Sequence, residues 1–158
     1  MALRVTIRKA KKEDRWKIRC LVWRACLNPT DLDWGRFVVG VDTSEKVVAC
    51  GQIKIHRDGS KELASLVVAP KYRNRGLAHR IIKNLISDSD DNIYLICKVS
   101  LAGFYRKFGF MVVKKKDLPS YFKRIFGLIP FLTDNQSKKK GLLVMARNST
   151  HCSGEFDP

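Results

Sequence analysis

The sequence predicts an α/β (α+β) fold, in which helices flank a central sheet that is mixed but mostly antiparallel. The first observation is a hairpin signal, because Asp58-Gly59 separates two apolar and partly β-branched runs, 47–56 and 61–69. The second is the order strand, helix, strand across residues 63–98, since such a crossover returns the second strand parallel to the first. A sheet with both connections is mixed, and we expect six to seven strands and about four to five helices.

Each further element follows from the spacing of its apolar residues. Strands are predicted over 3–8, 37–41, 47–56, 61–69, 92–98, 110–114 and 141–147. Helical spacing predicts helices over 11–27, 76–86, 103–108 and 121–132, with a short helical turn at 31–36. Gly51 lies inside a predicted strand and is expected to mark a bend or bulge. Gly109 is expected to end a helix in a left-handed conformation.

The stretch 121–132 is basic and amphipathic and has two interpretations. Its apolar face consists of Tyr121, Phe122, Ile125, Phe126, Leu128, Ile129 and Phe131. Such a stretch can dock on a membrane or on a partner protein. We favour packing in the core, or a lid over a binding site.

The chain is strongly basic, with a formal net charge of +16 from 31 Lys and Arg against 15 Asp and Glu. This charge attracts acidic proteins, nucleic acids or anionic lipids. The alternative is a basic surface without a dedicated partner, because the charge is spread along the chain. No zinc finger, basic zipper or RNP pattern occurs in the sequence, so no specific nucleic-acid module is predicted.

The length of 158 residues predicts a single domain over 1–148, followed by a disordered C-terminal tail over 149–158. No apolar run approaches the ~20 residues that span a bilayer, and residues 1–3 lead directly into charged residues without a secretory segment. The five cysteines are odd in number and show no C-x-x-C spacing. We therefore expect reduced thiols, no metal and a cytoplasmic location. A monomer or homodimer is expected as a separate assumption.

The stretch 63–85 predicts an anion site at the start of a helix. Pro70 stops the strand 63–69, because proline offers no N–H group to a sheet. A basic loop follows over 71–75, and Gly76 opens the helix. The first N–H groups of a helix have no partner within it, and the helix dipole adds partial positive charge there. Gly76 removes a side chain where an anion would approach the backbone.

Two motifs give this pattern a family resemblance. Residues 73–78, Arg-Asn-Arg-Gly-Leu-Ala, fit R/Q-x-x-G-x-G/A, the acetyl-CoA pyrophosphate loop of the GCN5-related N-acetyltransferase (GNAT) superfamily. Residues 104–110, Phe-Tyr-Arg-Lys-Phe-Gly-Phe, resemble that superfamily's F-Y-x-K-x-G-F segment. The motifs occur in the family's order, and the resemblance covers most of 3–147. It implies the GNAT fold, whose parallel fourth and fifth strands splay apart.

The resemblance implies acetyl-CoA as the co-substrate, without a metal. Its pyrophosphate would lie on the loop residues Arg73, Asn74, Arg75, Gly76, Leu77, Ala78 and His79. Its pantetheine arm would pair with the backbone of the strand residues Leu66, Val67 and Val68. The asparagine that commonly follows the fifth strand in this family is absent here, and Ser100 is the candidate to replace its hydrogen bond to the coenzyme.

The resemblance also implies groups for proton transfer. Tyr105 matches the tyrosine that faces the coenzyme sulfur and acts as general acid; a phenol with an ordinary pKa of about 10 suits this role. The alternative is simple packing at a helix start. Glu62 lies near the position at which several family members carry a carboxylate base on the fourth strand, although an exposed charge at a hairpin end is the alternative. His56 and His79 are the other titratable candidates, and His79 is expected to touch phosphate or solvent.

The predicted activity is that of an N-acetyltransferase: transfer of the acetyl group of acetyl-CoA to a primary amine by direct attack in a ternary complex. The acceptor would be a protein N-terminus, a lysine or a small amine. Cys97 is interpreted as a packed thiol rather than an acyl-enzyme nucleophile, because no His–Asp pair is evident beside it. In the family the region after the first strand lies over the acceptor channel, so Trp23 and Trp34 either line a pocket or pack at the core. The alternative function is a catalytically weak acyl-CoA sensor or interaction module.

Overall fold

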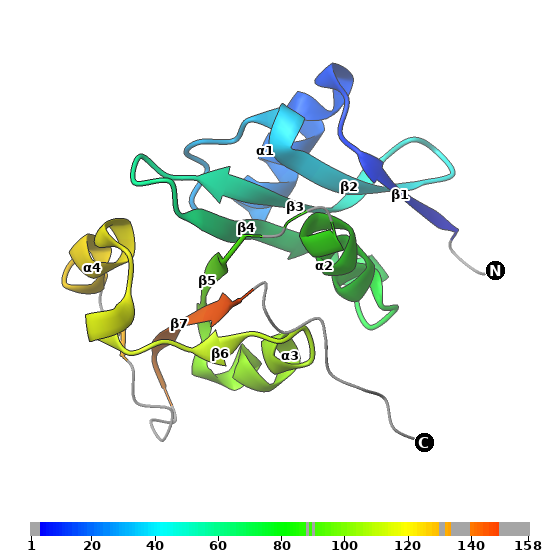
Figure 1. Cartoon of the computed structure of the whole chain (residues 1–158). Helices are drawn as coiled ribbons and strands as arrows, with labels where there is room; N and C mark the ends of the chain where they lie inside the picture. Colours follow the sequence, from blue (N-terminus) through cyan, green and yellow to red (C-terminus); the bar gives the residue numbers. More distant parts are fainter. Residues whose placement is uncertain (1–3, 88, 90, 130–131, 134–139, 149–158) are drawn as a thin grey trace. The chain divides into compact units, whose positions relative to one another are not determined.

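The computed structural model describes residues 4–87, 89, 91–129, 132–133 and 140–148 (Figure 1). The helices in this part of the chain are α1 (Arg15–Arg24), α2 (Leu77–Ser87), α3 (Ala102–Arg106) and α4 (Ser120–Phe126). The strands are β1 (Val5–Lys9), β2 (Phe37–Asp42), β3 (Val47–Ile55), β4 (Lys61–Val68), β5 (Ile93–Lys98), β6 (Met111–Val112) and β7 (Leu142–Arg147). Short 3-10 turns are η1 (Lys12–Asp14), η2 (Trp34–Arg36), η3 (Pro70–Tyr72), η4 (Val99–Leu101) and η5 (Lys115–Asp117).

The strands form one sheet in the order β1-β2-β3-β4-β5-β7-β6. The pairs β1–β2, β2–β3, β5–β7 and β6–β7 are antiparallel. β4 and β5 pair in parallel, with Lys61 opposite Ile93 and Glu62 opposite Tyr94. The predicted mixed, mostly antiparallel sheet with parallel fourth and fifth strands is therefore confirmed. The parallel register covers these two positions, which is the short pairing expected of strands that splay.

Internal contacts divide the chain into two compact units. The first unit is Met1–Lys54 with Leu63–Asp88, and the second is Ile55–Glu62 with Ser89–Pro158. β4 therefore begins in the second unit and continues in the first. The single domain over 1–148 stays a prediction, and the tail over 149–158 lies outside the described residues.

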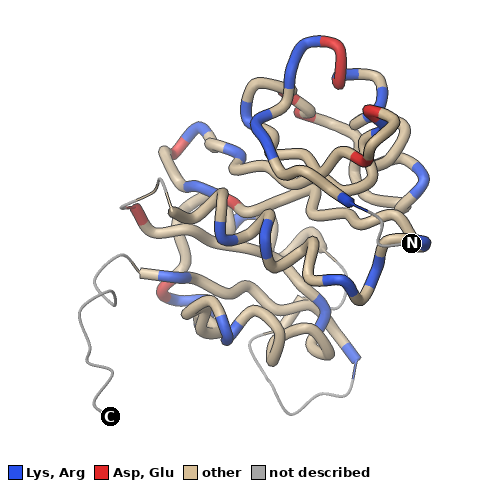
Figure 2. Tube along the Cα trace, turned by 90° about the vertical axis from the view of Figure 1, so that its right-hand side faces the viewer, with Lys and Arg blue, Asp and Glu red and all other residues tan. Residues whose placement is uncertain are grey.

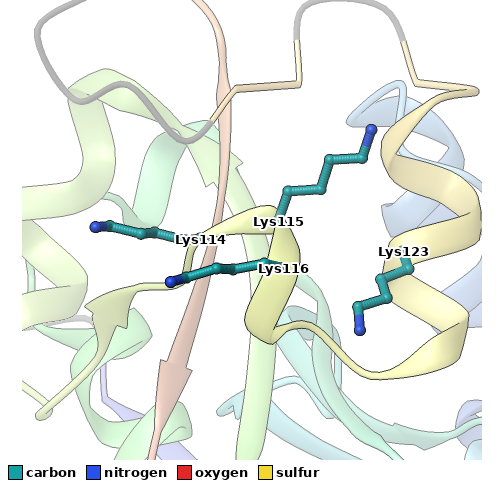
Figure 3. Close-up of a pocket in the computed structure, with 4 residues that line it drawn as sticks. All are labelled: Lys114, Lys115, Lys116 and Lys123. Atoms are coloured by element: carbon teal, nitrogen blue, oxygen red, sulfur yellow. The ribbon is translucent and has the colours of Figure 1, made fainter.

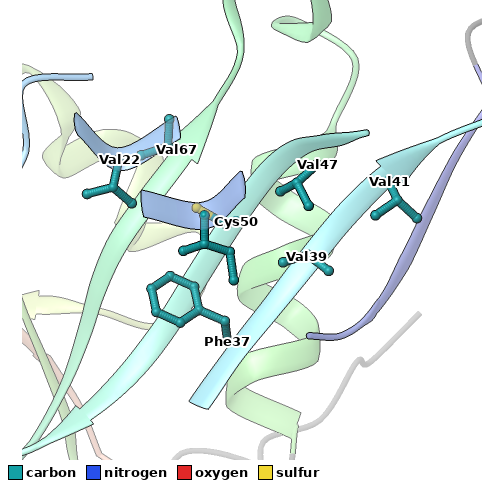
Figure 4. Packing of buried hydrophobic residues seen from close by; sticks show 8 residues of the cluster. Val22, Phe37, Val39, Val41, Val47, Cys50 and Val67 are labelled. Atoms are coloured by element: carbon teal, nitrogen blue, oxygen red, sulfur yellow. The ribbon is translucent and has the colours of Figure 1, made fainter. Parts of the chain in front are cut away.

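The core of the first unit joins α1 to β2, β3 and β4. Its buried side chains are Ile18, Val22, Phe37, Val39, Val41, Val47, Cys50 and Val67. Figure 4 shows Val22 of α1 facing Phe37, Cys50 and Val67 from three different strands. Burying each large apolar side chain contributes about 1.5–3 kcal/mol, so these contacts hold α1 against the strands.

Gly51 of β3 allows a close approach of α2 within the first unit. A Cβ atom at Gly51 would lie 3.0 Å from Ile81 Cγ2 and 3.2 Å from Leu85 Cδ1. Since neighbouring residues of a strand face opposite sides, Gly51 faces α2 while Cys50 faces α1. The register shift between β2 and β3 falls at Gly40/Val41 and not at Gly51. The predicted bend or bulge at Gly51 was therefore wrong for this pairing, and the glycine serves packing.

The core of the second unit is built around α4. Phe122 is fully buried with Leu118 and Val144, and Tyr121, Ile125 and Phe126 of the same helix pack against this cluster. The interpretation of 121–132 as a core-packing segment is confirmed for these residues. The helix is shorter than predicted and ends at Phe126, Leu128 is 73% exposed, and Phe131 lies outside the described residues.

The bounds of several helices and strands differ from the predicted ones. Gly109 follows α3 with φ +84°, which confirms the left-handed conformation. β6 has two residues where five were predicted over 110–114. The predicted helix 11–27 begins as η1 and ends at Arg24. No helix among the described residues is long and apolar enough to cross a membrane.

Candidate functional site

The candidate anion loop, residues 73–78, begins after β4 and η3 and leads into α2 within the first unit. Arg73 Nε donates a hydrogen bond to the carbonyl oxygen of Val68 at 3.1 Å. The Tyr72 hydroxyl donates one to Asp42 Oδ2 at 2.8 Å. This bond raises the pKa of Tyr72 and lowers that of Asp42. The two contacts tie the loop to the end of β4 and to the end of β2.

The backbone of the anion loop leaves its N–H groups open. Asn74 (φ 58°) and Gly76 (φ 72°) are left-handed, a conformation that glycine adopts freely and asparagine tolerates. A Cβ atom at Gly76 would meet no atom within 4 Å. In the described part of the chain, the N–H groups of residues 74–78 donate no backbone hydrogen bond outside the sheet and helices, whereas the Gly76 carbonyl accepts one from Arg80 N at 3.0 Å. Open donors at the positive end of the α2 dipole suit an anion.

The predicted cofactor-binding residues of the first unit differ in exposure. The exposed ones are Arg73, Asn74, Arg75, Gly76 and His79; the half-buried ones are Leu66, Val68 and Ala78; the buried ones are Val67 and Leu77. A ligand can therefore reach the two arginine side chains, but it can meet Leu77 only through its backbone. Neither Arg73 nor Arg75 forms an ion pair with a described carboxylate, so both charges are available to an anion.

A buried polar contact in β4 was not predicted. Ser65 lies within the strand with φ 54°, and its hydroxyl accepts a hydrogen bond from Gln52 Nε2 at 3.1 Å. The same Nε2 donates to the carbonyl oxygen of Asp31 at 3.2 Å. Gln52 is fully buried, and its Oε1 has no partner among the described residues. A left-handed serine inside a strand departs from extended backbone just before Leu66, and no local sequence signal reveals it.

The second unit pairs two candidates that the sequence treats as alternatives. His56 Nε2 and Glu62 Oε2 are 2.7 Å apart, and their side chains are 10% and 14% exposed. The Tyr121 ring stacks on the His56 ring with centroids 3.5 Å apart, and Phe122 meets it edge-on at 5.8 Å. We call His56 and Glu62 the hairpin dyad. A hydrogen-bonded imidazole and carboxylate, half enclosed by aromatic rings, can accept and hold a proton.

The turn of this hairpin also anchors α4. Asp58 Oδ2 accepts a hydrogen bond from the backbone N–H of Tyr121 at 2.7 Å. Asp58 Oδ1 accepts bonds from the hydroxyl and the N–H of Ser60 at 2.6 Å and 3.0 Å. The hydrogen bond from the Ser60 hydroxyl, followed by that from the Tyr121 N–H, lowers the pKa of Asp58 to about 2. The predicted Asp58-Gly59 turn thus also fixes the helix that stacks on the dyad.

Tyr105 lies on α3 in the second unit, with its phenol in an apolar setting. Its ring contacts Phe104 and Phe110 edge-on at 5.1 Å and 6.1 Å. Burial, and then the nearby Cys97, raises the pKa of Tyr105 to about 12. Burial raises the pKa of the Cys97 thiol to about 11, and its sulfur lies 3.7 Å from Met145 Sδ. Both groups are therefore protonated at neutral pH, and Cys97 has the surroundings of a packed thiol.

The remaining predicted site residue, Ser100, lies in η4 and is exposed. It belongs to the second unit with Tyr105 and Glu62, while the anion loop belongs to the first unit. Each group is therefore placed within its own unit. Among the described residues, no group of three or more His, Cys, Asp or Glu side chains is positioned to hold a metal ion.

A separate groove of about 550 Å³ in the second unit is lined by Lys114, Lys115, Lys116 and Lys123 (Figure 3). Lys115 Nζ lies 5.3 Å from the centroid of the Phe126 ring, and Figure 3 shows Lys114 and Lys116 extending in the same direction. None of the predicted site residues lines this groove. It is a second cationic feature, formed by three consecutive lysines and by Lys123 of α4.

The family model described as acetyltransferase (GNAT) domain matches residues 33–112, half of the chain. The chain therefore belongs to the GNAT acetyltransferase family. This family assignment confirms the resemblance seen in the sequence. Among curated proteins, none matches the chain.

Solved structures share the fold at low sequence identity. N-acetylglutamate synthase from Neisseria gonorrhoeae, complexed with coenzyme A and N-acetyl-glutamate, matches 91% of the chain with TM-score 0.67 and 16% identity. The match covers 35% of that protein, so the chain spans about a third of its length. A GNAT acetyltransferase from Staphylococcus aureus matches with TM-score 0.66 and 16% identity, covering 92% of this chain and 99% of that one. The Mycobacterium tuberculosis protein Rv2747, in complex with CoA and NLQ, gives TM-score 0.66 and 17% identity over 88% of this chain and 97% of that one.

Proposed function

We propose that the protein is an acetyl-CoA-dependent N-acetyltransferase that acts on a primary amine. The observation that carries this proposal is the anion loop, whose N–H groups at residues 74–78 are open beside a left-handed Gly76 in a chain of the GNAT family. The neighbours crystallised with coenzyme A support acetyl-CoA as the co-substrate. The acceptor is a protein N-terminus, a lysine or a small amine, and the cytoplasmic location rests on the sequence alone.

The residues of the anion loop fit a diphosphate. Open space lies over the Cα atom of Gly76, where a side chain would otherwise project. Backbone N–H groups donate directly to phosphate oxygens at such helix starts. Arg73 and Arg75 add charge-assisted hydrogen bonds, since both are exposed and neither pairs with a described carboxylate. Bound acetyl-CoA would supply the activated acyl group.

Proton transfer is assigned to side chains of the second unit. We assign the general acid to Tyr105, whose phenol carries its proton at neutral pH because burial raises its pKa to about 12. We assign the proton acceptor to Glu62, supported by its 2.7 Å contact with His56. The thiol of Cys97, with a pKa of about 11, is a weak nucleophile at neutral pH. This supports direct attack of the amine on the thioester rather than a covalent acyl-enzyme.

The test is a thiol-release assay with acetyl-CoA and a panel of peptides, polyamines and amino acids. We expect release of coenzyme A that depends on one class of amine acceptor and falls strongly in Tyr105→Phe. Calorimetry with acetyl-CoA alone accompanies it. If acetyl-CoA binds but no acceptor leads to thiol release, the protein is an acyl-CoA sensor rather than an enzyme. If acetyl-CoA does not bind, both functions are refuted.

A further inference from the structure

Two tryptophans of α1 face solvent in the first unit. Trp16 is 64% exposed and Trp23 is 71% exposed. Tryptophan rarely remains this exposed, because its ring is the largest apolar surface among the side chains.

Both rings lie on the side of α1 that is opposite the core. At about 100° per residue, positions 16 and 23 differ by only about 20° around the helix axis. The exposed Cys20 lies between them along the helix. Ile18 and Val22, which are buried, point away from this side. We call Trp16, Cys20 and Trp23 the α1 aromatic face.

Arginines flank the α1 aromatic face. The guanidinium carbons of Arg15 and Arg19 lie 5.4 Å and 5.5 Å from the Trp16 ring centroid. Arg24 is exposed beyond Trp23. Among the described residues, none of these three arginines forms an ion pair with a carboxylate. The face therefore combines exposed indole rings with uncompensated positive charge.

We propose that the α1 aromatic face docks on the surface of an anionic membrane. Indole rings partition to the level of the lipid headgroups, where their amphipathic character is satisfied. Guanidinium groups beside them bind the phosphates of the same headgroups, and a cluster of basic residues adds attraction to an anionic leaflet. α1 lies in the plane of such a surface as an interfacial helix and does not span the bilayer.

The positive charge of the protein favours an anionic membrane, rather than a second copy of the chain, as the partner of the α1 aromatic face. Each copy carries a net charge of +16, and Lys and Arg recur along the coloured, described part of the trace in Figure 2. Two such faces brought together would place the arginines of α1 against one another. A single-stranded nucleic acid is also less suited, because base stacking needs a bare ring and Trp16 already carries two guanidinium groups. The docking does not depend on the proposed acetyl transfer.

The experiment measures binding of the full chain to lipid vesicles. Vesicles of phosphatidylcholine are compared with vesicles that contain about a third phosphatidylglycerol, at low and at physiological salt. We expect at least about tenfold stronger binding to the anionic vesicles, with a blue shift of tryptophan fluorescence and quenching by brominated lipid. Trp34, which packs against the core of the first unit, supplies an unshifted background signal.

Two variants test the face itself. Trp16→Gln with Trp23→Gln should lower binding to anionic vesicles about tenfold and abolish the blue shift. Arg15→Gln, Arg19→Gln and Arg24→Gln together should lower it by a similar factor. The matched control removes three exposed charges elsewhere in the first unit, Lys9→Gln, Lys46→Gln and Lys83→Gln. Circular dichroism verifies that each variant folds.

Three results would overturn the proposal. The first is no binding, or equal binding to both kinds of vesicle. The second is equal loss of binding in the control and in the arginine variant, since the attraction would then come from overall charge. The third is binding that the tryptophan substitutions leave intact. Tighter binding of a single-stranded oligonucleotide, with the same loss in the tryptophan variant, would reassign the face to nucleic acid.

Discussion

The anion loop and the hairpin dyad are built in opposite ways. The loop offers backbone N–H groups that are consecutive in sequence, beside Gly76, which has no Cβ atom. The dyad uses side chains from the two arms of a hairpin, enclosed by a ring from α4. A local sequence motif can therefore specify a site made of backbone groups, whereas a site made of side chains depends on tertiary contacts. The comparison predicts that the two regions control different kinetic constants.

The largest effect is expected from Tyr105→Phe. Loss of the general acid should lower kcat by about 10²–10⁴-fold, while the acetyl-CoA Kd from calorimetry stays within about twofold. Tyr94→Phe is the control, since Tyr94 is also a tyrosine of the second unit with a raised pKa, packed beside Phe122. It should change kcat by less than about threefold. A normal kcat for Tyr105→Phe would remove the general-acid role.

The pH profile sharpens this prediction. The ordinary pKa of 10.0 is raised to about 12 in Tyr105, so the protonated form persists as the pH rises through 10. A loss of kcat due to this phenol should appear only near pH 12. An alkaline loss centred below pH 10 that disappears in Tyr105→Phe would contradict the assignment.

The next effect is expected from Glu62→Gln, which removes the carboxylate of the dyad. We predict a fall in kcat of about tenfold to a hundredfold, with little change in acetyl-CoA affinity. His56→Gln should give a smaller fall, because it leaves the carboxylate in place. Glu45→Gln, at a 74% exposed position, is the control. If Glu62→Gln lowers the melting temperature but leaves kcat unchanged, the dyad is structural.

Gly76→Ala is expected to weaken the binding of acetyl-CoA rather than to slow turnover. The left-handed φ of 72° strains any residue with a Cβ atom by roughly 1–2 kcal/mol, and the added methyl group occupies the space over the loop. We expect the acetyl-CoA Kd to rise about tenfold or more while kcat at saturation changes little. Gly103→Ala is the control, since a Cβ atom there also meets nothing within 4 Å and its φ is not left-handed. Equal acetyl-CoA Kd values for Gly76→Ala and Gly103→Ala would contradict the role of the anion loop in binding.

The smallest effect is expected from Asp58→Asn, which weakens the anchor of α4. The lost charge-assisted bonds should lower the free energy of unfolding by about 0.5–1 kcal/mol at pH 7 in denaturant titrations. The folded-state pKa of about 2 lies below the ordinary 3.8, so the charged form stabilises the fold above pH 3.8. This contribution is lost as the pH falls toward 2, and the wild-type advantage should vanish there. If the difference in free energy of unfolding between the wild type and Asp58→Asn grew as the pH falls, the role assigned to Asp58 would be contradicted.

Sequence reasoning reached the fold and the loop for a physical reason. The turn Asp58-Gly59, the stop at Pro70 and the left-handed glycines 76 and 109 are local requirements of the backbone. Apolar periodicity located the helices and strands, because burial recurs on every turn of α2, on alternate residues of β5 and continuously along most of β2 and β3. The bend or bulge expected at Gly51 does not occur in the β2–β3 pairing, and the glycine instead admits the close approach of α2, a contact between distant segments.

The same limit explains what was missed at the site. His56 and Glu62 were weighed as separate candidates, although both flank one tight turn and such positions can face each other. The stacking of Tyr121 on His56 joins segments about 65 residues apart, which no local pattern reports. The buried Gln52–Ser65 bond and the outward turn of Trp16 likewise depend on tertiary packing.

The most direct test of the account follows the backbone amide resonances of the isotope-labelled chain during titration with acetyl-CoA. We predict that the amides of residues 74–78 shift most, in a saturable manner, and that Gly76→Ala suppresses these shifts at the same ligand concentration. Unchanged resonances for 74–78, with saturable shifts confined to other residues such as Lys114–Lys116, would contradict the claim that this loop holds the diphosphate.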